Sequence, residues 1–250
     1  MPASSSLTGK VALVTGAARR IGAAISRCLH RQGVSVAIHY RGSHAEADAL
    51  CADLNALRPD SALAVHADLA EIDKLPALID QVTAWQGRLD ILINNASSFY
   101  PTPVGEITAA HWDDLVGSNL KAPLFLSQAA LAELRKTRGV IINIVDIHAQ
   151  RPLRHHVLYG SAKAGLAMLT RALAKDLAPE IRVNGVSPGA ILWPDAGLTE
   201  QTKAAILRQV PAGRPGDPGD IASCVLYLVR DADYVTGQII AVDGGRSIGW

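Results

Sequence analysis

The stretch KVALVTGAARRIG, residues 10–22, decides the fold of this chain. Its first part is apolar and rich in β-branched residues, as in a buried strand, and ends in Thr-Gly. A glycine turn between a strand and a helix lets the backbone approach a phosphate at the helix N-terminus. The stretch therefore predicts a strand–turn–helix unit that can hold a phosphate. The helical spacing i, i+3, i+4, i+7, i+8 is met by Ile21, Ala24, Ile25, Cys28 and Leu29.

Similar apolar runs recur along the rest of the chain and alternate with helical patterns. Such alternation implies parallel strands joined by right-handed crossovers, and strands this apolar suit a sheet covered on both faces. We predict a single α/β domain over residues 1–250, a Rossmann-type, doubly wound parallel sheet of about seven strands with helices on both faces. Residues 190–215 have no strand signal and are expected to cover the substrate. The other predicted strands are 34–40, 62–69, 89–97, 139–146, 181–189 and 237–245.

Composition excludes several classes of protein. The chain has 250 residues, of which 49% are hydrophobic and 19% charged, and its net charge is +1. These values favour neither disorder nor binding to nucleic acid or an anionic membrane. The 3 cysteines form no CxxC pair, so we predict neither a disulfide nor a metal site. We find neither a signal-peptide pattern nor an apolar run of about 20 residues, so we expect a cytoplasmic protein with a small-molecule partner.

The end of the second predicted strand favours NADPH over NADH as the cofactor. NAD-binding proteins place an acid there to hold the ribose 2′-hydroxyl, whereas this strand ends HYRGS at 39–43. Arg41 in that segment and Arg20 in the glycine loop are predicted to pair with a 2′-phosphate. Asp68 is expected to accept from the adenine amino group, to cap the next helix, or to do both. With the NNAS segment, the predicted cofactor contacts are Gly16, Arg20, Ile21, Gly22, His39, Tyr40, Arg41, Ser43, Asp68, Leu69, Asn95, Ala96 and Ser97.

A tyrosine and a lysine four residues apart carry the predicted chemistry. Tyr159 and Lys163 share one face of a predicted helix, because residues i and i+4 are neighbours there, so both are also predicted to contact the cofactor. An ammonium ~4 Å from a phenol, at an effective dielectric near 20, is worth roughly 4 kcal/mol. Lys163 is therefore expected to lower the pKa of Tyr159 and to suit it for general acid catalysis. Asp146 stands upstream at the end of an apolar run, where a carboxylate can also cap a helix or turn.

These motifs resemble the short-chain dehydrogenase/reductase family over almost the full chain. The resemblance rests on TGAARRIG, ADL, NNAS, GSNLKAP, YGSAK, RVNGVSPG and VTGQIIAVDGG. It implies hydride transfer from a nicotinamide and, commonly, a homotetramer. It also implies that Tyr159 is the acid, Lys163 its partner at the cofactor ribose, and Asn119 a proton-relay residue. Pro188 and Gly189 would lie near the nicotinamide.

The chain departs from the family pattern at two positions. Arg20 replaces the middle glycine of the phosphate loop, and Asp146 stands where a serine normally helps to hold a substrate carbonyl oxygen. A carboxylate would repel the oxyanion that develops in ketone reduction, so simple ketone reduction is disfavoured. Reducing a C=N bond needs no free oxyanion, because the new proton goes to a nitrogen. Asp146 would either stay charged and keep the phenol of Tyr159 protonated, or carry a proton to it.

Both departures occur together in the pteridine reductases, which the chain also resembles through NNASSFYPT at 94–102. That resemblance implies that Phe99 stacks the pterin against the nicotinamide. It also implies that Ser97 and Arg20 contact pterin and cofactor, and that Trp193 closes the pterin pocket. One difference is Gly42, where these relatives have a basic residue, so Arg41 would act alone at that place. The predicted substrate contacts are Arg20, Ser97, Phe99, Asp146, Tyr159 and Trp193.

The leading hypothesis is an NADPH-dependent pteridine reductase that reduces dihydropterins, with oxidised pterins and dihydrofolate as further candidate substrates. The alternative within the same fold is a carbonyl or 3-oxoacyl thioester reductase. A nucleotide-sensing binding protein without catalysis is disfavoured because Asn119, Tyr159 and Lys163 are all present. His155 and His156 precede the helix without an obvious partner and are interpreted as surface residues.

Overall fold

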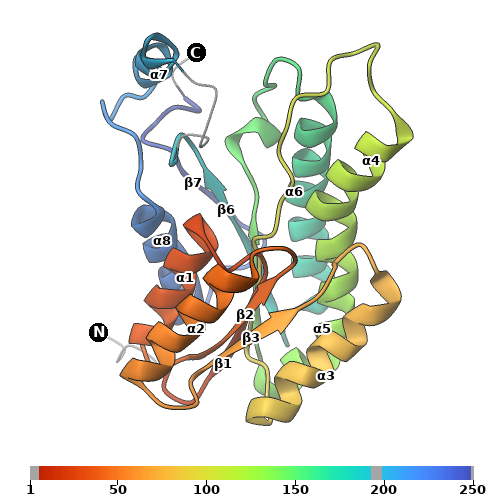
Figure 1. Cartoon of the computed structure of the whole chain (residues 1–250), viewed down its shortest axis with the longest axis vertical. Helices are drawn as coiled ribbons and strands as arrows, with labels where there is room; N and C mark the ends of the chain where they lie inside the picture. Colours follow the sequence, from red (N-terminus) through yellow and green to blue (C-terminus); the bar gives the residue numbers. More distant parts are fainter. Residues whose placement is uncertain (1–5, 193–198, 249–250) are drawn as a thin grey trace.

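The protein is built on a parallel sheet with helices on both faces (Figure 1). The structure is a computed structural model that describes residues 6–192 and 199–248. The strand order is β3-β2-β1-β4-β5-β6-β7, and each neighbouring pair is parallel, which confirms the predicted fold class. The strands are β1 (Val11–Val14), β2 (Ser35–Tyr40), β3 (Ala62–His66), β4 (Ile91–Asn94), β5 (Val140–Ile144), β6 (Arg182–Pro188) and β7 (Ile239–Val242).

Two groups of helices cover the sheet, as Figure 1 shows. One face carries α1 (Arg20–Arg31), α2 (His44–Leu57) and α8 (Pro218–Arg230). The other carries α3 (Leu75–Gln86), α5 (Ala122–Thr137) and α6 (Val157–Leu177), with α4 (Ala109–Val116) packed beside α6. The remaining elements are α7 (Glu200–Leu207), the 3₁₀ turns η1 (Ile72–Lys74) and η3 (Ile147–Ala149), and the π-helical turn η2 (Gly117–Lys121).

The first strand shows why the sequence is apolar without interruption. Side chains alternate between the faces of a sheet, so Ala12 and Val14 join one hydrophobic core while Val11 and Leu13 join the other. All four are buried, since helices cover both faces. A polar residue at any of these positions would be buried in one of the two hydrophobic cores. The alternation of an exposed face with a buried face, as in many antiparallel sheets, is therefore absent from this strand.

The order of the strands creates a crevice at one end of the sheet. β1 pairs with β2 on one side and with β4 on the other, so the chain crosses over the sheet between β3 and β4. Ligands of such sheets bind at this switch point, outside the carboxyl ends of the strands. The described part of the predicted covering segment contains α7, and its role stays a prediction. Within the described residues, no helix has the length and apolar character needed to cross a membrane.

Candidate active site

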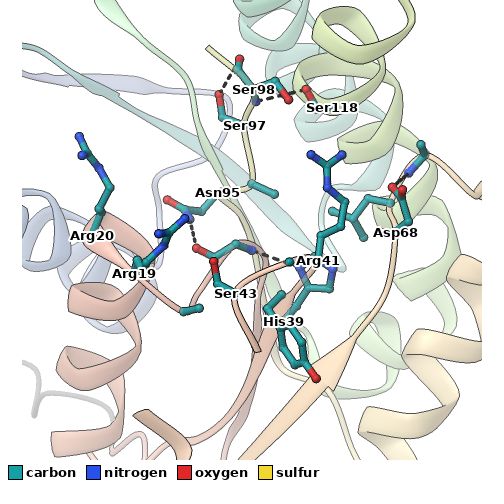
Figure 2. Close-up of a pocket in the computed structure, with 18 of the residues that line it drawn as sticks. Arg19, Arg20, His39, Arg41, Ser43, Asp68, Asn95, Ser97, Ser98 and Ser118 are labelled. Carbon is teal, nitrogen blue, oxygen red and sulfur yellow. Dashed lines mark hydrogen bonds between the residues drawn. The ribbon is translucent and has the colours of Figure 1, made fainter. Parts of the chain in front are cut away.

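A cavity of about 730 Å³ lies at the carboxyl ends of the first strands (Figure 2). Its volume is within the range of about 300–1,000 Å³ that is usual for small-molecule sites. The structure brings every residue predicted from the glycine loop and the first four strand ends into its wall. Those residues are Gly16, Arg20, Ile21, Gly22, His39, Tyr40, Arg41, Ser43, Asp68, Leu69, Asn95, Ala96 and Ser97.

The glycine loop is held tightly from the protein side. Gly16 has a φ of +58°, and a Cβ there would lie 2.9 Å from the Cα of Ala96, so glycine suits both the backbone and the space. The Nδ2 of Asn95 donates to the carbonyls of Thr15, at 2.8 Å, and Gly16, at 3.1 Å. The loop leads directly into the N-terminus of α1, the position at which a phosphate binds in folds of this kind.

His39 supports the same loop from β2. Its Nδ1 accepts from the N–H of Gly16 at 3.1 Å, and its Nε2 donates to the carbonyl of Ala67 at 3.1 Å. Burial lowers the pKa of His39 to about 4, which keeps the ring neutral with the proton on Nε2. Both ring nitrogens are therefore used inside the protein, which is a role that the sequence did not indicate.

Three arginines line the cavity: Arg19, Arg20 and Arg41. Arg20 has a φ of +55°, the left-handed region that favours glycine, at the position where the family has glycine. Figure 2 shows Arg20 and Arg41 on different sides of the cavity, and their joint contact with a 2′-phosphate stays a prediction. Arg19, which the sequence analysis missed, also lines the cavity and pairs with Glu46 at 3.4 Å. Its position next to Arg20 in the glycine loop is the sequence feature that could have identified Arg19 as a cavity residue.

Asp68 is not the N-cap of the next helical elements, which begin after Glu71 and Lys74, but its carboxylate accepts within the turn that precedes them. Its Oδ1 accepts from the N–H of Ala70 at 2.9 Å, so the carboxylate holds the turn after β3. It also lines the cavity, where a contact with adenine stays a prediction.

Asp146 and Tyr159 form the centre of a second polar group. The hydroxyl of Tyr159 donates to the Oδ2 of Asp146 at 2.7 Å. The Oδ1 of Asp146 accepts from the backbone N–H of His148 at 2.8 Å, which makes Asp146 the cap of the η3 turn. The two interpretations of Asp146, as a capping residue and as the partner of the tyrosine, therefore hold together. Lys163 lies nearby on α6 and donates from Nζ to the carbonyl of Ile144 at 2.8 Å.

The electrostatics of this group correct one prediction. Burial, followed by the charge and hydrogen bond of Asp146, raises the pKa of Tyr159 well above its ordinary value, with a small opposing effect of Ser97. The expectation that Lys163 lowers this pKa is wrong, because the carboxylate is in direct contact whereas Nζ lies 5.7 Å from the centre of the tyrosine ring. Tyr159 is thus kept as a neutral proton donor.

Burial of Lys163 makes stability depend on pH in a defined direction. Burial lowers the pKa of Lys163 to about 8, from an ordinary value of 10.5. Between these values the unfolded chain binds more protons than the folded protein, so the free energy of unfolding rises with pH. We expect the wild type to gain about 2 kcal/mol relative to Lys163→Met between about pH 7.5 and about pH 9.5, measured by urea denaturation.

The matched control for this measurement is Lys175→Met, an exposed lysine of the same helix. The raised pKa of Tyr159 acts in the opposite sense, but only above about pH 10, where the unfolded phenol begins to ionise. If the free energy of unfolding changed equally with pH in the wild type and in Lys163→Met, the lowered pKa of Lys163 would be contradicted.

The segment after β4 connects the cavity to the tyrosine. The Oγ of Ser97 donates to the Oδ1 of Asn119 at 2.7 Å, and the Nδ2 of Asn119 donates to the carbonyls of Ser98 and Leu115, both at 2.9 Å. Asn119 lies in the π-helical turn η2, a feature that is frequent at functional sites. Its predicted part in proton relay is not tested by these contacts.

Phe99 has a free surface next to the tyrosine. Its ring is 50% exposed and lies edge-on to Tyr159, with ring centres 4.8 Å apart. His156 stacks on Phe99 with ring centres 4.7 Å apart and an angle of 21°, so the expectation that His156 has no partner is wrong. His156 lies one helical turn before Tyr159, and this spacing was a signal that it faces the same site.

The remaining predicted residues are Pro188, Gly189 and Trp193. Pro188 ends β6, and Gly189, the next residue, donates from its N–H to the carbonyl of Val242 in β7 at 3.1 Å; neither residue lines the described cavity. Trp193 lies outside the described residues. Arg246, missed by the sequence analysis, is only 9% exposed, and its Nε has no hydrogen-bond partner among the described residues. Burial lowers the pKa of Arg246, while the charges of Asp146 and Asp243 oppose this effect.

Comparison with known proteins agrees with this geometry. A family model described as enoyl-(acyl carrier protein) reductase matches residues 16–247, which is most of the chain. The chain belongs to the short-chain dehydrogenase/reductase family. Membership makes it an oxidoreductase whose fold binds a nicotinamide cofactor, as the sequence motifs implied.

Individual members of this family point to more than one substrate. Pteridine reductase 1 of Leishmania tarentolae is 40% identical, and the match covers 98% of this chain and 98% of that protein. The 3-oxoacyl-[acyl-carrier-protein] reductase of Staphylococcus aureus is 38% identical, over 94% of this chain and 97% of that protein. An uncharacterised oxidoreductase of Methylorubrum extorquens is 36% identical, over 96% of this chain and 99% of that protein.

Proposed function

We propose that the protein is an NADPH-dependent pteridine reductase. The net reaction adds a hydride to a ring carbon of a dihydropterin and a proton to the adjacent ring nitrogen, which gives a tetrahydropterin and NADP⁺. Oxidised pterins and dihydrofolate are proposed as further substrates. The similarity to a pteridine reductase over nearly the whole of both chains supports this proposal.

The observation that carries the proposal is the hydrogen bond from Tyr159 to Asp146, at 2.7 Å. A carboxylate at this position disfavours the oxyanion of ketone reduction, whereas protonation of a ring nitrogen builds no such charge. Asp146 and burial together keep Tyr159 protonated, as a general acid must be before transfer. Phe99 offers a half-exposed ring beside this tyrosine, on which a flat heteroaromatic substrate can stack.

The residues around the cavity suit an NADPH molecule. We propose that the backbone at the start of α1, around Gly22, holds the pyrophosphate, that Arg41 binds the 2′-phosphate, and that Lys163 holds the nicotinamide ribose. The described end of β2 offers Arg41 and Ser43 where NAD-binding relatives use an acid. When bound, the nicotinamide supplies the hydride. Ser97 is proposed to contact both cofactor and pterin, because it lies between the cavity and Asn119.

A 3-oxoacyl thioester reductase is the second candidate, supported by the relatives that carry that name at 38% identity. Asp146 argues against it, for the reason given above. We also propose that residues 190–215 cover the substrate. The homotetramer stays a prediction from the resemblance, and the cytoplasmic location stays a prediction from the sequence pattern.

A substrate panel distinguishes the two candidates. With NADPH, we expect steady turnover of dihydrobiopterin, dihydromonapterin and dihydrofolate. Acetoacetyl thioesters should be reduced at least about 100-fold less efficiently by kcat/KM, because the site lacks the serine that holds a carbonyl oxygen. The measurement is the rate of NADPH oxidation, followed by its absorbance. Turnover of the thioester without any turnover of a pterin would reject the pteridine assignment and support the second candidate.

A further inference from the structure

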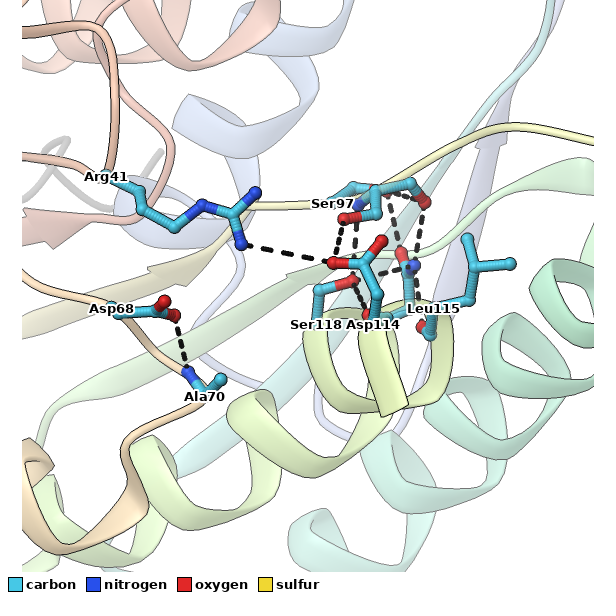
Figure 3. A network of polar contacts seen from close by, with 9 residues as sticks. Arg41, Asp68, Ala70, Ser97, Asp114, Leu115 and Ser118 are labelled. Carbon is cyan, nitrogen blue, oxygen red and sulfur yellow. Dashed lines mark hydrogen bonds and ion pairs between the residues drawn. The ribbon is translucent and has the colours of Figure 1, made fainter. Parts of the chain in front are cut away.

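Arg41 reaches across the cavity to an acid on α4. Its Nη1 lies 3.9 Å from the Oδ1 of Asp114, and Figure 3 shows the guanidinium extending from the end of β2 toward that carboxylate. The two side chains are 60% and 36% exposed, so solvent reaches the pair. Among the residues that the structure describes, this is the ion pair that Arg41 makes. The group proposed to bind the cofactor phosphate therefore already faces an anion of the protein.

The Asp114 carboxylate is held in place by its neighbours. The Oγ of Ser98 donates to its Oδ1 at 3.1 Å. The Oγ of Ser118 donates to the backbone carbonyl of Asp114 at 2.7 Å and accepts from the N–H of Ser98 at 3.3 Å. Burial and the adjacent Asp114 also raise the pKa of Tyr100. These contacts join α4 to the segment after β4, so Asp114 is a fixed acceptor within reach of Arg41 (Figure 3).

We propose that Asp114 is a specificity-determining residue that tempers the preference for NADPH, by occupying Arg41 where the cofactor's 2′-phosphate would otherwise bind it. The inference rests on the proposed function, because it takes Arg41 as the ligand of that phosphate. When NADPH binds, its 2′-phosphate must replace the Asp114 carboxylate as the partner of Arg41. NADH carries no 2′-phosphate and leaves the ion pair intact.

Asp114 is expected to weaken the binding of NADPH in two ways. The Arg41 pair must break before the phosphate can take its place, and the carboxylate then remains near a group of like charge. Exposed ion pairs are weak, so removing Asp114 is expected to tighten NADPH binding by about two- to fivefold rather than by orders of magnitude. Binding of NADH should not change, since neither effect involves the rest of the cofactor.

The test compares dissociation constants of NADPH and NADH for the wild type, Asp114→Asn, Arg41→Gln and the double variant, by quenching of protein fluorescence. Asparagine keeps an oxygen that can accept from Ser98, so the local hydrogen bonds can persist. Asp113→Asn is the matched control, because Asp113 also lines the cavity and is adjacent in sequence. We expect tighter NADPH binding in Asp114→Asn, a smaller change in Asp113→Asn, and a smaller effect of the Asp114 change once Arg41 is glutamine, because only the repulsion then remains.

The outcomes separate this inference from the proposed function. If Arg41→Gln weakens NADPH binding but Asp114→Asn leaves it unchanged or weakens it, the role of Asp114 is rejected while that of Arg41 stands. If Arg41→Gln leaves NADPH binding unchanged, both the phosphate contact and the inference fail. If Asp114→Asn raised the affinity for NADH as much as the affinity for NADPH, the inference would also be rejected. Should the asparagine protein not fold, Asp114→Ser gives the same comparison.

Discussion

Replacing Tyr159 with phenylalanine is expected to lower kcat for dihydropterin reduction by about 10²–10⁴-fold. The hydroxyl is the proton donor of the site, and its hydrogen bond to Asp146 at 2.7 Å is the contact that orients it. The ring itself should stay in place, because it is buried and packs against Phe99. The dissociation constant of NADPH should change by less than about threefold, since most of the cofactor cavity lies away from the phenol. Stopped-flow measurement of single turnover, with NADPH titration alongside, checks both expectations.

Tyr100→Phe is the matched control. Tyr100 lies in the segment that carries Phe99, but its hydroxyl is near Asp114 rather than Asp146. This variant should retain turnover within about threefold of the wild type, since it removes no proposed proton donor. Retention of full activity by Tyr159→Phe would show that another group delivers the proton, and would remove the main support for the proposed mechanism.

Replacing Asp146 with serine is expected to reduce pterin turnover on the order of 100-fold. The change removes the acceptor of the Tyr159 hydroxyl and the negative charge that helps to keep the phenol protonated. It also installs the residue that the family normally uses at this position to hold a carbonyl oxygen. We therefore expect reduction of an acetoacetyl thioester to rise while dihydrobiopterin reduction falls. The ratio of the two kcat/KM values is the measurement.

Asp146→Asn is the control for geometry. An amide oxygen can still accept from Tyr159 or from the N–H of His148, so the η3 turn should remain. It has neither the charge nor an exchangeable carboxyl proton, and its pterin turnover should fall as well. Wild-type pterin turnover in both Asp146 variants would refute the account of this residue. Loss in the serine variant alone would assign the effect to the hydrogen bonds rather than to the carboxyl group.

The local pattern of the chain was enough to predict the sheet and its cofactor crevice. The run before Gly16 is apolar over its whole length and the later strands are mostly apolar, because residues in a sheet covered on both faces have no exposed side. Strand ends are visible in sequence, so Arg41 and Asn95 could be assigned to one cavity wall before their positions were known. Arg20 was also placed correctly in that wall, yet not beside Arg41, since the direction of a long side chain depends on its surroundings.

By itself, the sequence determined the fold, the glycine loop and the spacing of Tyr159 and Lys163, because these depend on periodicity and on residues close together in the chain. Only the tertiary structure decided how the groups act on one another. It placed Asp146 in contact with Tyr159, and it buried Lys163 deeply enough to lower its own pKa rather than that of the phenol. Contact distances and loss of solvent arise from packing between elements, so a pattern along one chain does not report them.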